Sequence, residues 1–237
     1  MGLSVVSEVV VLHRDRALIV VDKPAGLLSI PGRGPEHGPD LRTLLEAQLG
    51  QKVWVVHRLD RGTSGAMAFA LDADTHRTLS LAFERGEVHK RYLALVTGKV
   101  ERDEGTVDLP LIPARRGRMR TARPGEAGKE SQTAYRVLRR FESFSWVELQ
   151  PTTGRQHQIR VHMLALGHPL AVDEDYRGAK RLTAQDLGGA TASSEIILAR
   201  TPLHAARLEL PRGKETLTVE APLPGDLAAA LALLGHQ

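Results

Sequence analysis

The chain has 237 residues, 42% of them apolar, a length and composition typical of one large globular domain or two small ones. It has no cysteine, which excludes disulfides, thiolate zinc sites and thiol catalysis, and its net charge of +4 is too small to identify a partner. No run of about 18 apolar residues is present and the first residues lack a signal-peptide pattern, so we expect a cytoplasmic protein without a membrane segment.

Strands and helices are predicted in turn over the first ninety or so residues. Two β-branched runs, 5–13 and 17–22, predict strands, and a turn at 23–26 leads into a loop rich in proline and glycine. Two helices follow, each starting at an aspartate and ending at a glycine. Their predicted limits are Asp40 to Gly50, and Asp72 or Asp74 to Gly86.

The middle of the chain predicts mainly strands. Residues 90–98 alternate, with Tyr92, Ala94 and Val96 on one face and Leu93 on the other. Three further strands are predicted, of which the last two form a hairpin: 106–112, 131–141 and 143–150.

A helix with chemical character is predicted next. Thr152 or Thr153 is expected to cap it, and Gly167 to end it. Its apolar face, which we expect in the core, carries Ile159, Met163 and Leu166. A second face is polar and cationic and carries His157 and Arg160.

The last part of the chain predicts a polar surface loop, two strands and a helix. Residues 178–194 are rich in glycine, alanine and serine and predict a mobile loop, followed by strands at 203–210 and 215–223 and a helix at 226–234. Strands follow one another without regular βαβ alternation, which favours an α+β fold around a mixed, mostly antiparallel sheet. No repeat or linker divides the chain, so we expect a single domain over 1–237.

The stretch VHRLDRGTSG, residues 56–65, places one acid among cations. Asp60 lies between Arg58 and Arg61, in a loop between two apolar runs that predict buried strands. Positive neighbours favour an ionised carboxylate, the form that acts as a nucleophile. The alternative is a structural turn with solvated arginines, because Asp and Gly are ordinary turn residues.

An arginine-rich stretch, residues 114–123, contains five arginines and no acid. It is either a solvated hairpin tip or a contact for a polyanion. We expect an RNA-gripping hairpin that uses Arg115, Arg116, Arg118 and Arg120.

Several other chemistries are excluded by missing motifs. There is no Walker loop, no GxGxxG after a strand and no GxSxG elbow. His157 and His162 are not spaced as in the HExxH zinc helix, so we expect no metal and no cofactor. A glycosidase needs two carboxylates, and no marker connects a second acid, in 101–104 or 173–175, with Asp60.

HRLDRGTSG resembles the catalytic-loop signature of the RNA pseudouridine synthases of the ribosomal large-subunit (RluA-like) family. Four further segments match that family in order: VVDKPAGLLSIPGR, KRYLALV with VDLPLI, GRQHQIRVHMLALGHPLAVD, and LHAARLEL. Five motifs in order over about residues 11–227 make a chance resemblance very improbable. The resemblance implies the pseudouridine synthase fold.

The resemblance also implies isomerisation of uridine to pseudouridine in structured RNA, either tRNA or large-subunit rRNA. The enzyme flips the uridine out of its stack, because the reacting atoms are otherwise unreachable. By resemblance no cofactor or metal takes part, and we expect RNA as the partner and a monomer as the working form. Whether the aspartate attacks the ribose or the base stays open.

Residue roles are carried over from matching positions. The resemblance makes Asp60 the nucleophile, Arg160 its ion-pair partner, and Tyr92 the ring that stacks on the target base; from the residues alone, Tyr92 is more simply a core aromatic. Arg58 fills the space of the flipped base. Further RNA contacts are implied for His57, Gly154, Arg155, His157 and Gln158.

Two departures from the family and two rival functions remain. Only about ten residues precede the first family strand, so we expect no separate N-terminal RNA-binding domain, as in the short single-domain branch. Residues 177–200 are longer and more polar than expected. The rivals are a non-catalytic RNA-binding or folding helper and a hydrolase that uses Asp60.

Overall fold

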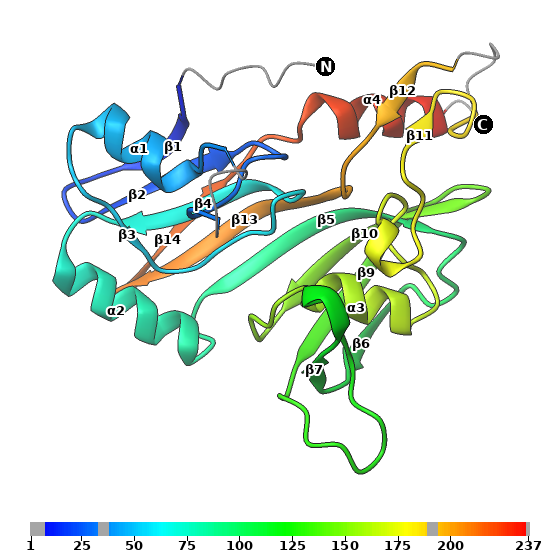
Figure 1. Cartoon of the computed structure of the whole chain (residues 1–237), viewed down its shortest axis with the longest axis horizontal. Helices are drawn as coiled ribbons and strands as arrows, with labels where there is room; N and C mark the ends of the chain where they lie inside the picture. Colours follow the sequence, from blue (N-terminus) through cyan, green and yellow to red (C-terminus); the bar gives the residue numbers. More distant parts are fainter. Residues whose placement is uncertain (1–7, 33–37, 189–193, 236–237) are drawn as a thin grey trace. The chain divides into compact units, whose positions relative to one another are not determined.

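The computed structural model describes residues 8–32, 38–188 and 194–235. They form two compact units, one from the described residues within 8–88 and 207–221 and the other from those within 89–206 and 222–235. The registered strand pairs within each unit are antiparallel and each unit carries helices, which confirms the α+β class (Figure 1). A single catalytic domain over residues 1–237 stays a prediction.

The first unit is organised around β4 (Ser64–Ala70), a strand whose seven residues are all buried. β2 (Leu18–Lys23) pairs with β4, and β1 (Val10–Arg14) pairs with β2. The short β3 (Trp54–Val55) also pairs with β4. Pairing of β14 (Glu215–Glu220) with Arg207–Arg212 of β13 (Leu203–Arg212) confirms the closing strand pair.

Both helices of this unit begin at the predicted aspartates. The Asp40 carboxylate accepts the Thr43 N–H before α1 (Leu41–Leu49), which ends at Gly50 with φ 66°. The Asp72 carboxylate likewise accepts the Thr75 N–H before α2 (Ala73–Glu84). The apolar face of α2 joins a core cluster with residues of β2, β4, β13 and β14.

The second unit contains a sheet in which β5 pairs with β10, β10 with β9, and β9 with β6. These strands are β5 (His89–Thr97), β6 (Glu104–Asp108), β9 (Gln132–Arg140) and β10 (Phe144–Pro151). The predicted β9–β10 hairpin is therefore confirmed. The faces of β5 separate as expected, because Tyr92, Ala94 and Val96 pack in one core cluster and Leu93 packs in another.

The arginine-rich stretch forms the predicted hairpin. β7 (Leu111–Pro113) pairs with β8 (Met119–Thr121), and the turn η2 (Arg115–Gly117) connects them. The single strand expected at 106–112 is divided between β6 and β7. Pro110, which has no N–H to donate to a ladder, lies at the break.

The helix that carries Arg160 is shorter than predicted. α3 spans Gln158–Ala165 and begins after His157, whose φ of 53° is left-handed. Expecting a cap at Thr152 or Thr153 was wrong, because the Thr153 hydroxyl donates to the Gln158 side chain instead (2.7 Å). The apolar face prediction is confirmed, since Ile159, Met163 and Leu166 pack in one core cluster.

Residues 178–188 are packed into the fold at several points. β11 (Leu182–Thr183) pairs with β12 (Ile196–Leu198), and Leu182 and Leu187 are buried, so the prediction of a surface loop was wrong for these residues. Most of the rest of this described segment is turn or coil. Residues 189–193 lie outside the described residues. The turn η3 (Glu174–Tyr176) precedes this segment, and the predicted C-terminal helix is α4 (Gly225–Leu234). Within the described ranges, no helix has the length and apolar character needed to cross a membrane.

Candidate active site

Asp60 lies in the predicted loop between β3 and β4. Its carbonyl accepts the N–H of Thr63 (3.0 Å), which closes a turn just before the strand. Leu59 is buried, Asp60 is partly buried and Arg58 is exposed. Arg58 has no hydrogen-bond or ion-pair partner among the residues that the structure describes. The loop therefore presents one carboxylate beside one guanidinium that is open to a ligand.

Residues 23–29 clamp this loop on both sides of Asp60. Lys23 is fully buried, and its Nζ donates to the carbonyls of Pro24 (2.9 Å), Leu27 (2.7 Å) and Arg61 (3.3 Å). Ser29 Oγ donates to the Leu59 carbonyl (2.7 Å) and accepts the Leu59 N–H (3.1 Å). Leu59 and Arg61 are the two neighbours of Asp60, so the backbone is fixed immediately before and after the carboxylate.

Arg61 also has a structural role that the sequence did not indicate. Its Nε donates to the Gly26 carbonyl (2.9 Å), and the Gly26 N–H donates to the Arg61 carbonyl (2.8 Å). Gly26 has φ 87°, a backbone conformation that residues other than glycine rarely adopt. The two segments are thus joined by reciprocal bonds at a position that favours glycine.

His57 is engaged inside the same unit. Its Nε2 accepts the N–H of Ala68 (2.9 Å), and its ring stacks on Phe83 with centroids 4.5 Å apart. An Nε2 that accepts leaves the neutral ring's proton on Nδ1. These contacts favour a positioning role for His57 over the expected RNA contact.

Arg160 is the centre of the second unit's polar cluster. Only 8% exposed, it forms a bidentate pair with buried Asp173, from Nε to Oδ2 and from Nη2 to Oδ1, each 2.7 Å. Nη2 also contacts Asp175 Oδ2 at 3.3 Å, and the guanidinium lies 4.7 Å from the centre of the Tyr176 ring. The charge and the plane of this guanidinium are therefore held on several sides.

Asp173 and Tyr176 were missed by the sequence reasoning. The acidic run at 173–175 was noted only as lacking a connection to Asp60. The signal that could have found Asp173 is its place soon after a cationic helix and directly after the apolar run 170–172, where a buried acid needs a partner. Tyr176 is 3% exposed, and burial is the main cause that raises the pKa of its hydroxyl.

The candidate RNA contacts in the segment that leads into α3 differ in their exposure to solvent. Gly154 and Arg155 are exposed, and the Arg155 Nε donates to the Glu130 carbonyl (3.0 Å). Gln158 is 4% exposed. Its side-chain oxygen accepts hydrogen bonds from the Thr153 hydroxyl and the Arg155 N–H. Its side-chain nitrogen donates to the Gln132 carbonyl and the Thr133 hydroxyl. This burial favours a positioning role for Gln158.

Lys90 is a partly buried amine on the same face of β5 as Tyr92. Its Nζ donates to the Thr153 carbonyl (3.2 Å), which connects β5 with the segment before α3. Burial lowers the pKa of Lys90 to about 8. Lys90 thus titrates near the pH range in which an enzyme works.

The four arginines of the hairpin differ in their surroundings. Arg115 and Arg116 are exposed, with no ion pair among the described residues. Arg118 Nε pairs with Asp175 (3.1 Å), and Arg120 forms a bidentate pair with Glu126 (2.6 and 2.7 Å). The Arg120 guanidinium lowers the pKa of Glu126 to about 2. Only the first two are therefore fully available to an anion.

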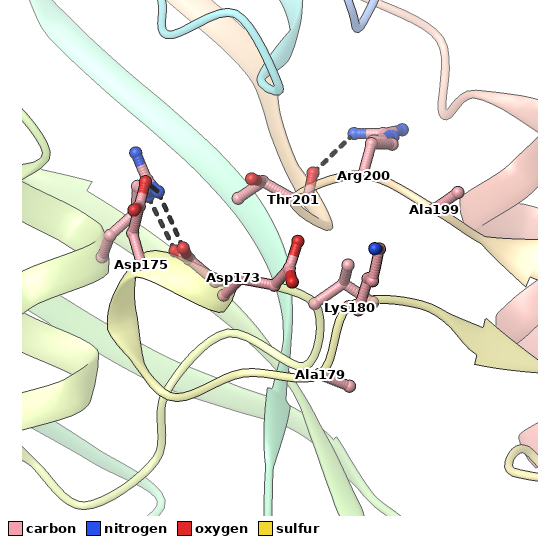
Figure 2. A pocket seen from close by; sticks show the side chains of 10 residues that line it. Asp173, Asp175, Ala179, Lys180, Ala199, Arg200 and Thr201 are labelled. Carbon is pink, nitrogen blue, oxygen red and sulfur yellow. Dashed lines mark hydrogen bonds and ion pairs between the residues drawn. The ribbon is translucent and has the colours of Figure 1, made fainter.

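A polar hollow of about 250 Å³ has Arg160 in its lining. Figure 2 labels Asp173, Lys180 and Arg200 around it. Its lining residues are Arg160, Val172, Asp173, Glu174, Asp175, Ala179, Lys180, Ala199, Arg200 and Thr201. Pockets for small molecules usually measure about 300–1,000 Å³, so this hollow is smaller than a typical small-molecule site. No group of three or more metal-binding side chains occurs in the parts of the chain that the structure describes.

The chain belongs to the RNA pseudouridylate synthase family, whose family model matches residues 17–165. The ribosomal large subunit pseudouridine synthase D of Nitrosomonas europaea is 42% identical over 93% of this chain, which spans 64% of that relative's length. The dual-specificity RNA pseudouridine synthase RluA of Yersinia pestis is 40% identical over 84% of this chain and 90% of its own. The expected family is therefore confirmed.

Solved structures agree with the expected pseudouridine synthase fold. Human RNA Pseudouridylate Synthase Domain Containing 4 is similar with a TM-score of 0.75 and 28% sequence identity, covering 95% of this chain and 93% of its own. Human RNA Pseudouridylate Synthase Domain Containing 1 gives a TM-score of 0.74 at 26% identity.

The predicted site residues divide between the two units. His57, Arg58 and Asp60 share one loop of the first unit, whereas Tyr92, Arg160 and residues 154–158 belong to the second. Within the second unit, His157 and Arg160 both contact Tyr176. The expected helix face shared by His157 and Arg160 was wrong, because His157 precedes α3 in a left-handed conformation. The pairing of Arg160 with Asp60 stays a prediction.

Proposed function

We propose that this protein isomerises uridine to pseudouridine in structured RNA. One observation carries the proposal: in a chain of this family, Asp60 sits in a loop whose backbone is clamped on both sides by Lys23 and Ser29. A nucleophile must be held close to its productive geometry, and clamping of its neighbours achieves this.

The reaction exchanges one bond of the base for another. The bond between N1 of uracil and C1′ of ribose breaks, the base turns, and C5 bonds to C1′. The C5 proton is lost and N1 gains a proton, so no atom is consumed. Asp60 supplies the carboxylate that attacks the ribose or the base and is released unchanged.

Arg160 and Tyr92 act on the same uridine in this proposal. Arg160 orients the Asp60 carboxylate, and its own plane is fixed by Asp173. Tyr92 stacks on the base; it is half-buried on the core face of β5, a place that favours a fixed ring. All three residues are required together, which is why we propose one catalytic domain built from both units.

RNA is held by exposed cations. Arg58 fills the place of the flipped base, while Gly154, Arg155 and the hairpin arginines contact phosphates. The RNA is tRNA or large-subunit rRNA, supported by relatives whose names carry dual RNA specificity and the ribosomal large subunit. We further propose a cytoplasmic monomer that uses no nucleotide cofactor.

Release of the C5 hydrogen tests this function directly. Transcripts of tRNA and large-subunit rRNA labelled with tritium at C5 of uridine are incubated with the wild-type protein and with Asp60→Ala. We expect tritium release and pseudouridine formation by the wild type, and neither by the variant, whose RNA binding stays near that of wild type. RNA binding without any release by the wild type would instead favour the non-catalytic helper, and free uracil would favour the hydrolase.

A further inference from the structure

The arginine hairpin is joined to the surroundings of Arg160 by three hydrogen bonds. The N–H of Met119 donates to Tyr176 Oη (2.8 Å), and Arg118 Nε donates to Asp175 Oδ1 (3.1 Å). The Gln156 side chain donates to the Gly117 carbonyl (3.2 Å). The tip of the hairpin is therefore attached to η3 and to the segment before α3.

The same two residues of η3 also contact Arg160. Asp175 uses its second oxygen, Oδ2, for Arg160 Nη2 (3.3 Å), so one carboxylate is shared between the hairpin and Arg160. The Tyr176 ring lies against the Arg160 guanidinium, 4.7 Å from its centre. Tyr176 and Asp175 thus each contact both Arg160 and the hairpin directly.

Packing and a strained residue hold this junction together. Tyr176 packs with Leu111, Val161 and Met119 in a small apolar cluster formed by the hairpin and α3. Its hydroxyl accepts the Met119 N–H and is placed to donate to His157 Nδ1, 2.7 Å away. His157 has φ 53°, a strained conformation that persists only where the surroundings fix it.

We propose that Tyr176 and Asp175 are positioning residues that couple the hold of the hairpin on RNA to the orientation of Arg160. Phosphates that fix the hairpin thereby fix Tyr176 and Asp175, and these residues in turn hold the guanidinium. Coupling of this kind is reciprocal: an ordered Arg160 also favours the RNA-binding position of the hairpin. The inference rests on the proposed function, because it gives Arg160 its task.

Tyr176→Phe tests the coupling, since it keeps the ring against Arg160 and removes only the hydroxyl. We expect kcat to fall about tenfold, the size of a typical coupling between sites, with KM for RNA changed less. The matched control is Tyr135→Phe, the same change at another buried tyrosine of the second unit, for which we expect an unchanged kcat. Equal kcat values for the two variants would overturn the proposal.

A comparison of two arginines of the hairpin gives a second test that does not touch the core. Arg118→Ala breaks a link to Asp175, so we expect a lower kcat and a higher KM, whereas Arg115→Ala should raise KM with little change in kcat. Combined with Tyr176→Phe, Arg118→Ala should lower kcat further than either change alone, because the two changes interrupt two separate links between the hairpin and Arg160. A double variant no slower than Tyr176→Phe alone, or equal kcat values for the two arginine variants, would contradict the coupling.

Asp60→Ala, assayed in parallel, separates this inference from the proposed function. If Asp60→Ala is inactive and Tyr176→Phe matches the wild type, the coupling alone is refuted. If Asp60→Ala remains active, the proposed function fails and the task given to Arg160 fails with it.

Discussion

Lys23→Met removes the ammonium group that clamps the Asp60 loop while keeping an apolar side chain of similar length. Three carbonyls lose a donor, and the Leu27 carbonyl lies in a buried bond. An unsatisfied buried group costs about 1–3 kcal/mol, and the two partly buried carbonyls should each cost about 1 kcal/mol. We therefore expect the free energy of unfolding to fall by about 3–5 kcal/mol.

The same change should loosen the backbone next to Asp60. A misplacement of about 1 Å can cost about a hundredfold in rate, so we expect kcat to fall by about that factor at saturating RNA. Urea denaturation and tritium release measure the two effects. Lys214→Met, at an exposed lysine of the same unit, is the control and should change stability by less than about 0.5 kcal/mol. A Lys23→Met protein as stable and active as the control would refute the clamp.

Three further predictions follow from the second unit. Asp173→Ala removes the carboxylate that forms the buried bidentate pair with Arg160 and should destabilise the protein by about 3–5 kcal/mol in urea denaturation; a loss below about 1 kcal/mol would contradict the buried pair. Lys90 has a folded-state pKa of about 8, below its usual 10.5, so the folded state binds fewer protons between these pH values and wild-type stability should rise there relative to Lys90→Met; parallel stability curves would show that the amine is not perturbed. The Arg115→Ala, Arg116→Ala double variant should reduce the slope of log K for RNA against log salt by about 1.4–1.8; an unchanged slope would mean that the tip is merely solvated.

Much of the fold follows from local patterns. The caps Asp40 and Asp72 were predictable because a short acidic side chain satisfies N–H groups that the first turn leaves open. The faces of β5 followed from strand alternation alone. The start of α3 did not, because Thr153 has two possible partners and only the folded chain offers it the Gln158 amide.

The sequence predicted the candidate catalytic residues better than the contacts that hold them in place. The Asp60 loop and the Arg160 face stand out as charged groups in short motifs. The clamp by Lys23, the pair with Asp173 and the role of Arg61 depend on contacts between residues up to 38 positions apart, which local patterns do not encode. The buried surroundings of Leu182 and Leu187 likewise come from packing that a polar sequence hides.

The central claim is that Asp60 of this protein makes pseudouridine in cellular RNA. The most direct measurement maps pseudouridines across tRNA and rRNA in cells that lack the protein, restored with either the wild-type gene or the Asp60→Ala gene at equal expression. We predict one or more uridine positions that are modified with the wild type and unmodified with the variant. Identical maps in both strains would contradict the account.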